Sequence, residues 1–344
     1  MRKSGRCFMY GIFVFLLSTV SCRQSTETAV SNITEPNVMP LALTAWADSP
    51  RIRIENWIKA ITDSTSPDFI PVGDRIAVFD NDGTLWPEQP VPNQAAFAFD
   101  YIKAASPSHP EWKKNPVLNG VIEGNMAPLQ KAGLKGLFEV VNISHSNVTT
   151  EAYSQSVRQW IDTAKDRKFN QRYKDIVYLP MVQLLEHLRT NGFKTFIVSG
   201  GGADFMRVWC EEAYGIPPYQ VIGSYGQLKY ELAGGKPTIT KLEGEVYVDD
   251  KAGKPAAIHR FIGKVPVLCG GNSDGDQAMM QYNSGSPYKS LCILLHHTDD
   301  VREYAYDKKT LSGHLETALD EAHTKGWMVV DMKRDFRKIF AFEK

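Results

Sequence analysis

Residues 76–86 read Ile-Ala-Val-Phe-Asp-Asn-Asp-Gly-Thr-Leu-Trp, and this stretch decides the fold that we expect. Its apolar start, 76–79, is typical of a strand that is buried on both faces of a parallel sheet. The run stops at two carboxylates, Asp80 and Asp82, which the turn residue Gly83 follows. Acids at the carboxyl end of such a strand lie where open α/β sheets bind ligands. The structural alternative is an Asx-rich turn that caps a helix.

Strand-like and helical stretches alternate again after residue 178. The expected strands are the apolar stretches 195–198, 221–224, 265–269 and 291–295, and 291–295 is the last firm strand along the chain. Helical patterns lie at 52–61, 181–189, 254–261 and 314–323, and alternation within 225–248 predicts a β-hairpin. This alternation of strands and helices predicts an α/β fold with a doubly wound parallel sheet, built from residues 43–90 and 178–344.

Residues 91–177, between the first two strands, carry helical patterns and no strand alternation. A helical block directly after a strand that ends in acids favours a lid, or cap, over a plain helical layer of the core. Its large aromatic residues Phe97, Trp112 and Trp160 are expected to pack inside the block rather than to form a platform for substrate. The predicted architecture is therefore a parallel-sheet core with an inserted α-helical cap.

The overall charge of the chain excludes some classes of partner. The 344 residues contain 39 Lys plus Arg and 39 Asp plus Glu, so no net field favours nucleic acid or an anionic membrane. The five cysteines show no Cys-x-x-Cys spacing, which argues against a zinc site and a disulfide scaffold. We therefore expect a protein that binds no nucleic acid.

The N-terminus has the pattern of an export signal. Within residues 1–22, a positive head precedes the apolar stretch 8–20, which is short for a membrane span. Ser21 and Cys22 follow, as at the end of a bacterial lipoprotein signal, and 23–42 reads as a flexible polar linker. We expect an exported lipoprotein of the bacterial cell envelope, held to the membrane only by a lipid on Cys22. Cleavage near Ser21 without lipid and an uncleaved anchor are the alternatives.

Polar side chains also follow the second strand and open a later helix. Ser199 ends the strand, and Gly200 is the first of three glycines after it. A hydroxyl and free backbone N–H groups at a helix start would cradle a phosphoryl group, whereas the alternative is a plain glycine-rich turn. Lys254 opens a helix before the next strand, where an ammonium would neutralise charge on a phosphoryl group. A solvated surface lysine is the alternative there.

The acidic loop 272–276 again follows a buried strand. Oxygen atoms from Asn272 and Asp276, together with Asp80 and Asp82, suit a small hard cation such as Mg²⁺. A calcium loop of the EF-hand type is the alternative, but its final Glu and its helix–loop–helix frame are missing from this stretch.

The two carboxylates of the first stretch are suited to different steps of phosphoryl transfer. Asp80, ionised at neutral pH, can attack phosphorus and form an aspartyl-phosphate. Asp82 can protonate the leaving oxygen and then activate water, which requires that the site raise its pKa.

The stretch Asp80-Asn81-Asp82-Gly83-Thr84 resembles the first motif of the haloacid dehalogenase superfamily, which consists largely of Mg²⁺-dependent phosphatases. The four strand-end pieces resemble its four motifs in their order over residues 75–297, and the phosphoserine-phosphatase-like group is the most similar. The resemblance implies a nucleophile at Asp80 and a general acid and base at Asp82. It also implies that the phosphoryl group is bound by Thr84, Ser199, Gly200 and Lys254, and that the metal is bound by Asp80, Asp82, Asn272 and Asp276.

One position departs from the family pattern. Asn272 stands where the family usually has Asp, so the site offers the metal less charge, and Asp274 is a candidate to compensate. Two further pairs have open roles. His296 and His297 are either a core or rim pair or a contact to substrate, and Glu88 and Gln89 are either a polar turn or a gate.

We therefore expect a phosphomonoester hydrolase that acts on a small phosphorylated metabolite. The haloacid dehalogenases themselves lack the second carboxylate, so Asp82 favours phosphoryl transfer. A phosphotransferase or phosphomutase of the same fold is one alternative, and a catalytically inactive lipoprotein that binds a phosphorylated ligand is another. The sequence identifies neither the substrate nor the oligomeric state.

Overall fold

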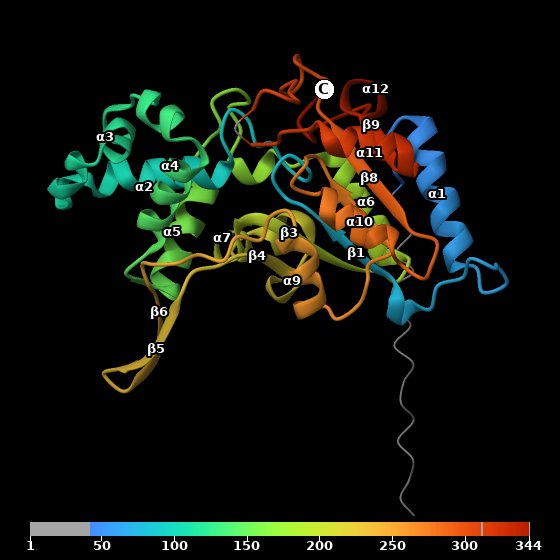
Figure 1. Ribbon diagram of the computed structural model, residues 1–344, viewed down its shortest axis with the longest axis horizontal. Helices are drawn as coiled ribbons and strands as arrows, with labels where there is room; N and C mark the ends of the chain where they lie inside the picture. The colour runs from blue at the N-terminus through green and yellow to red at the C-terminus, as the bar shows by residue number, and fades with distance from the viewer. Residues whose placement is uncertain (1–41, 311, 344) are drawn as a thin grey trace, which may run out of the picture. The chain divides into compact units, whose positions relative to one another are not determined.

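The computed structural model describes residues 42–310 and 312–343. The predicted signal, with Cys22, and nearly all of the predicted linker lie outside these residues. The described chain contains a six-stranded sheet with the order β4-β3-β1-β7-β8-β9, in which every neighbouring pair is parallel (Figure 1). The strands are β1 (Ile76–Phe79), β3 (Lys194–Gly202), β4 (Val221–Ser224), β7 (Leu268–Gly271), β8 (Leu291–His296) and β9 (Met328–Asp331). This sheet confirms the predicted α/β fold.

The central strand β1 alternates its side chains between two apolar layers. Ala77 and Phe79 belong to one buried cluster, whereas Ile76 and Val78 belong to another on the opposite face of the sheet. Helices cover the two faces, so the sheet is wound on both sides (Figure 1). α1 (Asp48–Thr62) and α6 (Leu179–Thr190) contribute to the first cluster, and α9 (Gly253–Phe261), α10 (Gln277–Ser284) and α11 (Thr317–Lys325) contribute to the second.

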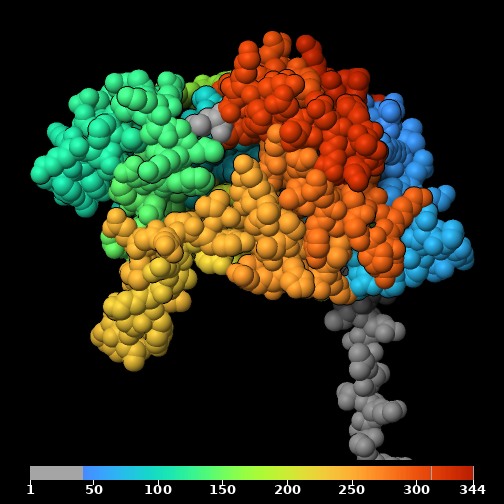
Figure 2. Space-filling view, in the orientation of Figure 1, coloured from blue at the N-terminus to red at the C-terminus, as the bar shows by residue number. Residues whose placement is uncertain are grey.

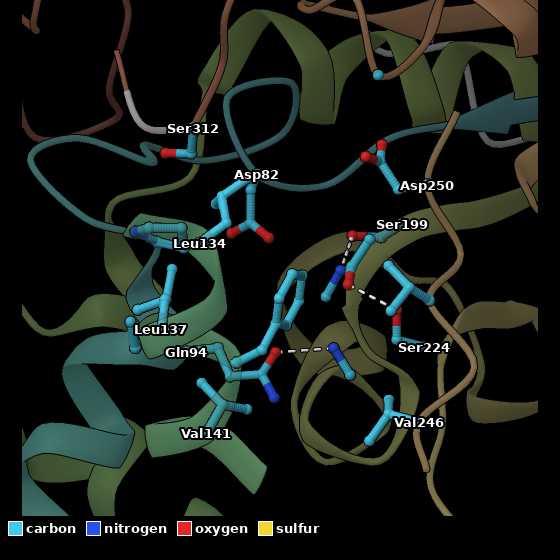
Figure 3. A pocket seen from close by; sticks show the side chains of 18 of the residues that line it. Asp82, Gln94, Leu134, Leu137, Val141, Ser199, Ser224, Val246, Asp250 and Ser312 are labelled. Carbon is cyan, nitrogen blue, oxygen red and sulfur yellow. Dashed lines mark hydrogen bonds between the residues drawn. The ribbon is translucent and has the colours of Figure 1, made fainter. Parts of the chain in front are cut away.

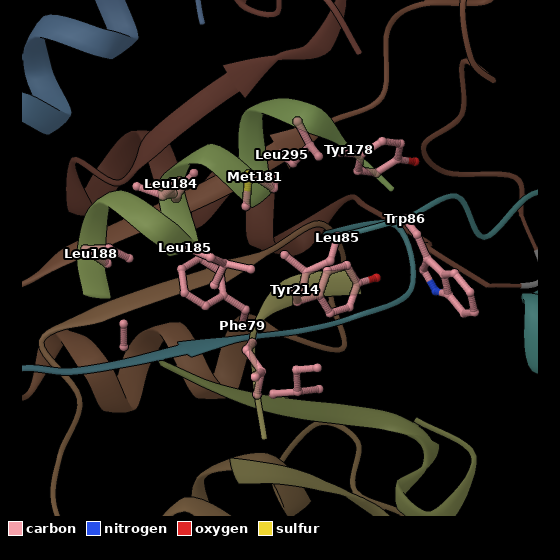
Figure 4. Close-up of a cluster of buried hydrophobic side chains, with 14 of the residues drawn as sticks. Phe79, Leu85, Trp86, Tyr178, Met181, Leu184, Leu185, Leu188, Tyr214 and Leu295 are labelled. Carbon is pink, nitrogen blue, oxygen red and sulfur yellow. The ribbon is translucent and has the colours of Figure 1, made fainter. Parts of the chain in front are cut away.

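The first cluster shows why α6 lies where it does. Met181, Leu184, Leu185 and Leu188 recur at helical spacing, and all four are buried against β1 and the loop after it (Figure 4). Full burial of one such side chain contributes about 1.5–3 kcal/mol, so this stripe fixes α6 on the sheet.

Two details of the sheet differ from the prediction. The stretch 291–295 is not the last strand, because β9 pairs with β8 at the sheet edge and extends the sheet by one strand. β7 begins at Leu268 and runs through two glycines rather than covering 265–269. Gly270 is required there, since a Cβ atom at this position would lie 2.6 Å from the ring of Phe79.

The segment between β1 and β3 is a helical block with an apolar cluster of its own. It comprises α2 (Asn93–Ala105), α3 (Pro116–Glu123), α4 (Ala127–His145) and α5 (Thr150–Thr163). Asn115 caps α3 by accepting hydrogen bonds from the N–H groups of Val117 and Leu118. α4 is kinked at Gly133, whose φ of 62° lies in the left-handed region. Phe97 and Trp160 are buried, as predicted, and Trp112 packs against the cluster of this block.

A second, smaller sheet joins the helical block to the predicted hairpin. The hairpin consists of β5 (Leu228–Ala233) and β6 (Lys236–Lys241), and Figure 2 shows its tip, in gold, projecting from the surface. β2 (Val148–Thr149), between α4 and α5, pairs antiparallel with β6. β2 and the hairpin, which are remote in sequence, therefore belong to one three-stranded sheet. No helix in residues 42–310 or 312–343 has the length and apolarity needed to cross a membrane.

Candidate active site

The carboxyl ends of three neighbouring strands bring the predicted acids together. Asp80 follows β1, and its backbone N–H donates to the carbonyl of Gly270 in β7 at 2.9 Å, which continues the parallel ladder. Lys254, in the first turn of α9, lies beneath this edge of the sheet. Its Nζ donates to Asp80 Oδ1 and to Asp276 Oδ1, each at 2.7 Å, and to the Val198 carbonyl at 3.0 Å. The lysine therefore links β1, β3 and the loop after β7.

Burial strongly affects the protonation of Asp80 and Lys254. It raises the pKa of Asp80 well above its ordinary value, and the nearby Asp276 adds to the rise, whereas Lys254 opposes it. Burial alone would lower the pKa of Lys254, but Asp276 and Asp80 raise it instead. The ammonium is therefore held in its charged form between two carboxylates.

Asp82 faces the cavity beside Asp80 (Figure 3). Burial raises its pKa to about 6, although the Trp86 indole N–H, which donates to Asp82 Oδ1 at 2.7 Å, opposes the rise. Trp86 is itself buried and stacks on Trp209 with ring centroids 4.2 Å apart. The carboxylate that the sequence assigns to proton transfer thus has a rigid hydrogen-bond partner and a pKa near neutrality.

The glycine segment after Ser199 leads into a helix, as predicted, because α7 (Ala203–Arg207) begins directly after Gly202. β3 continues through Gly202, and a shift in register against β4 lies between Ser199 and Gly202. The N–H of Gly201 donates to Ser199 Oγ at 3.0 Å, and the N–H of Gly202 donates to Gln94 Oε1 at 2.7 Å. These two groups already have partners, so the segment is a bulged strand end. Ser199 and Gly200 still line the cavity, together with Asp80, Asp82 and Lys254.

Thr84 and Asn272 bind each other below the cavity. Thr84 is fully buried, does not line the cavity, and donates from its hydroxyl to Asn272 Oδ1 at 3.0 Å. The structure therefore places Thr84 beside the predicted metal loop rather than at the predicted phosphoryl position. Asp276 Oδ2 accepts from the N–H groups of Asn272 and Ser273 at 2.9 and 3.1 Å, while its Oδ1 binds Lys254. Both oxygens of Asp276 are thus engaged in holding the loop and the lysine.

Asp274 does not compensate for Asn272, because its carboxylate faces another element. Its Oδ1 accepts from the N–H groups of Glu316 and Ala318 at 3.0 and 2.9 Å. These bonds cap α11, which begins at Thr317 rather than at His314 as predicted.

Glu88 is the acid that faces Asn272, and the sequence did not assign it to the metal site. Its side chain is buried, and Oε1 accepts from Asn272 Nδ2 at 2.6 Å and from the Tyr306 hydroxyl at 2.9 Å. Burial, followed by the nearby Asp82, raises the pKa of Glu88 well above its ordinary value. The sequence offered one signal for Glu88, its position two residues after Trp86. Only the folded chain shows that Glu88 contacts the loop that contains Asn272.

His297 supports the first motif from behind. It is buried, its Nε2 lies 2.7 Å from the carbonyl of Gly83, and its Nδ1 lies 3.0 Å from Glu303 Oε2. His297 does not line the cavity, so the core position that the sequence offered as one alternative is the correct one. Gln89 donates to the Ser312 carbonyl at 3.0 Å, at the mouth of the cavity.

The cavity between these strand ends and the helical block has a volume of about 620 Å³. Within residues 42–310 and 312–343, no three His, Cys, Asp or Glu side chains converge as a metal cluster. A metal held here would therefore need amide or backbone oxygens as well as carboxylates.

A buried aspartate bound to a lysine, beside a second aspartate with a pKa near neutrality, is the arrangement that phosphoryl transfer through an aspartyl-phosphate requires. The model of one family, the haloacid dehalogenase-like hydrolases, matches residues 77–281. The match covers more than half of the chain, and the chain belongs to this family. This confirms the resemblance seen in the motifs, and the protein is a hydrolase of this family.

Three solved structures are similar to the chain, and the first of them supports the fold. A conserved protein of unknown function from Anaerococcus prevotii DSM 20548 has a TM-score of 0.54 at 14% identity, over 86% of this chain and 96% of its own. A protein of unknown function from Bordetella pertussis Tohama I has a TM-score of 0.45 at 13% identity, over 75% and 98%. A phosphoserine phosphohydrolase-like protein from Francisella tularensis has a TM-score of 0.38 at 14% identity, over 73% and 98%. No curated protein matches the chain.

Proposed function

We propose that this protein is a Mg²⁺-dependent phosphomonoesterase that forms an aspartyl-phosphate with a small phosphorylated substrate. The observation that carries the proposal is the pair at the floor of the cavity. Asp80 is held by Lys254 at 2.7 Å, and Asp82 beside it has a pKa of about 6. A phosphatase needs both groups, whereas a protein that only binds a phosphorylated ligand has no use for a proton donor at this position.

The charges at the site fit a divalent cation. Of the four acids at the site, Asp80 and Asp276 bind the one ammonium, that of Lys254, and Asp82 and Glu88 lie near Asp80. The pKa of Asp80 and of Glu88 is raised well above the ordinary value. Such an excess of carboxylates in a buried site needs positive charge before all of them ionise.

The candidate donors for that cation are oxygens of the residues that follow β1 and β7. Lys254 binds only Oδ1 of Asp80, and Oδ2 is a candidate ligand together with the main-chain carbonyl of Asp82 and the Asn272 amide oxygen. Bound Mg²⁺ would act as a Lewis acid on the phosphoryl oxygens and keep Asp80 ionised. Glu88, bonded to the Asn272 amide, supplies the charge that Asn272 lacks.

The residues of the chain divide the reaction into two steps. In the first, Asp80 attacks phosphorus, the bond from phosphorus to the leaving oxygen breaks, and protonated Asp82 gives that oxygen its proton. In the second, ionised Asp82 takes a proton from water and the water oxygen attacks phosphorus. The bond from phosphorus to the Asp80 oxygen breaks, which frees the Asp80 carboxylate and releases inorganic phosphate. Ser199 binds the phosphoryl oxygens in both steps, and the positive charge of Lys254, bound to Asp80 Oδ1, offsets the negative charge of those oxygens.

Phosphate release from an aryl phosphate tests this proposal. We expect turnover by the full chain with Mg²⁺, none with EDTA, and recovery when Mg²⁺ is restored. Asp80→Asn should abolish turnover, whereas the matched control Asp74→Asn should retain it, because Asp74 binds Lys264 at the surface. Turnover that persists in EDTA would contradict the metal requirement, and turnover by Asp80→Asn would contradict the covalent intermediate.

We also propose that the chain is exported and carries a lipid on Cys22. The support is the pattern of residues 1–22, namely a positive head, a short apolar stretch and a terminal cysteine. Mass spectrometry of the N-terminal peptide of the mature protein tests it. A lipid-modified Cys22 is the expected result, and an unmodified N-terminus near Ser21 would contradict it.

A further inference from the structure

The cavity has a second end that the reaction does not use. Beyond Asp80 and Asp82, two elements supply its walls, α4 of the helical block and the segment that follows β6. Figure 3 shows Leu134, Leu137 and Val141 on one side and Val246 on the other. We call this region the apolar end, and it consists of Leu134, Leu137, Phe138, Val141, Leu242, Val246 and Val248.

The side chains of the apolar end are unusually exposed for their type. Leu134 is 47% exposed, Phe138 is 44% exposed and Val246 is 39% exposed. Scattered apolar residues on a surface need no explanation, but several that meet around one cavity mark a place where an apolar ligand binds.

The polar groups nearest to the apolar end are already paired with one another. Gln94 Nε2 lies 3.0 Å from His145 Nε2, and Ser144 Oγ lies 2.6 Å from His145 Nδ1. Burial lowers the pKa of His145 to about 3, and the nearby Lys241 contributes, so the ring is neutral. The carbonyl oxygen of Gln94 accepts from Gly202. The imidazole therefore offers no charge to a ligand.

The one ammonium beside these residues is also neutralised. Lys241 forms an ion pair with Asp204, and its Nζ lies 4.9 Å from the ring centroid of Tyr153. The other charged groups that line the cavity come from loops of the core. Asp250 and Lys251 lie on the side of the phosphoryl site, because Asp250 lies against Gly200 and Gly275 and the Lys251 backbone N–H donates to the Gly275 carbonyl at 3.1 Å. Within the described chain, the apolar end thus has no free charge to bind a charged group.

We propose that the substrate is the phosphate monoester of an uncharged, apolar alcohol, whose alkyl or aryl part occupies the apolar end. This inference rests on the proposed function and names the class of its substrate. A carboxylate or ammonium on the leaving group, as in an amino-acid or amino-alcohol phosphate, would lose water here without gaining a counter-ion. An apolar group would instead remove exposed surface of Leu134, Phe138 and Val246 from water.

Alkyl phosphates test the inference without changing the chemistry of the leaving group, because all are esters of primary alcohols. The full chain is assayed with Mg²⁺ on ethyl, hexyl and 6-aminohexyl phosphate and on phosphoserine. We expect kcat/KM for hexyl phosphate to exceed each of the others by about tenfold or more, since burial of a single methylene gives discrimination on this order.

Paired variants locate the effect at the apolar end. Phe138→Ser should reduce the ratio of kcat/KM between hexyl and ethyl phosphate several-fold. The matched control is Phe261→Ser, because Phe261 is also a helical residue, is 55% exposed and does not line the cavity. It should leave the ratio unchanged.

The outcomes separate this inference from the proposed function. Release from phosphoserine or 6-aminohexyl phosphate as fast as from hexyl phosphate would overturn the inference and leave the phosphatase in place. A ratio that Phe138→Ser and Phe261→Ser change equally would also overturn it. No release from any ester, by a chain that unfolds cooperatively, would overturn the proposed function and the inference with it.

Discussion

The two ends of the cavity are built in different ways. The phosphoryl end takes Asp80, Ser199 and Asp276 from the ends of three adjacent strands, and Lys254 from one helix binds two of them. The apolar end takes its residues from a helix and from the segment after a hairpin, which the two-residue strand β2 links through its pairing with β6. The sheet thus fixes the chemistry, whereas segments inserted between its strands shape the site for the leaving group.

The two ends also differ in charge. Four acids and one lysine meet at the phosphoryl end, whereas at the apolar end Lys241 and Asp204 neutralise each other beside a neutral His145. Substitutions at the phosphoryl end should therefore change rate and stability, and substitutions toward the other end should change mainly the preference among substrates.

Lys254→Met should have the largest effect, because it leaves Asp80 and Asp276 buried without their cation. Loss of one partner from a buried ionic group costs about 3–5 kcal/mol of unfolding free energy. Urea unfolding measures this cost, and phosphate release should fall below detection. Lys264→Met is the matched control, since Lys264 pairs with Asp74 at the surface and its loss should cost under about 1 kcal/mol. Equal costs for the two variants would contradict the buried triad.

Asp82→Asn should reduce kcat/KM for an alkyl phosphate by about 10²–10⁴-fold, the usual contribution of a general acid. The acid form of Asp82 is present below its pKa of about 6 and is lost as the pH rises above it. The wild-type rate of phosphoryl transfer should therefore fall above pH 6. That limb of the pH profile should disappear in the variant. Nitrophenyl phosphate is the control substrate. Its leaving group needs little protonation, so the variant should lose much less of its kcat/KM on this ester. An unchanged profile in the variant would assign the titration to another group.

Glu88→Gln should weaken Mg²⁺ binding by about 10–100-fold, the usual effect of a lost partner to a metal ligand. A glutamine oxygen can still accept from Asn272 and Tyr306, so the variant removes charge and keeps the hydrogen bonds. Titration calorimetry with Mg²⁺ measures the affinity. The double variant Glu88→Gln, Asn272→Asp should recover it, because it returns a carboxylate to the loop. A double variant as weak as the single one would show that Glu88 acts through shape rather than charge.

Gln94→Ala should have the smallest effect, since it removes one hydrogen bond between the strand end and the helical block and one between α2 and α4. The amide binds Gly202 at 2.7 Å and His145 at 3.0 Å. At about 1 kcal/mol for each net hydrogen bond, kcat/KM should fall by roughly five- to thirtyfold. Gln159→Ala, at an exposed position of α5, is the control and should leave the rate unchanged. A loss as large as that of Asp82→Asn would place Gln94 in the chemistry itself.

The same contrast explains which parts could be predicted from the sequence. Asp80 and Asp82 were predictable because a continuous apolar strand leads directly to them, and local pattern alone places them at the sheet edge. β9 was not predicted, because only four residues alternate there between buried and partly buried positions. The helix expected after Ser199 is present, but the bulge that precedes it was not predicted, because three glycines suit a bulged strand as well as a helix start.

Contacts between side chains that are remote in sequence could not be predicted from the sequence. Asp274 and Glu88 are both acids near a motif, and nothing local shows that one caps α11 while the other faces Asn272. The pairing of β2 with β6 was equally hidden, since two residues make no periodic pattern. The walls of the apolar end depend on that pairing, so its composition could be interpreted only in the folded chain.

The ion pairs of Lys254 also bear on how the chain reaches its active form. They join a residue at position 80 to one at position 276, and the lysine between them comes from a separate helix. Contacts so distant in sequence form late, because a long loop must close before they stabilise anything. A refolding chain should recover helical content well before it recovers turnover. Enzyme activity is therefore a kinetic probe of the final assembly step, and a nascent chain that ends before residue 276 would remain inactive even with its nucleophile in place.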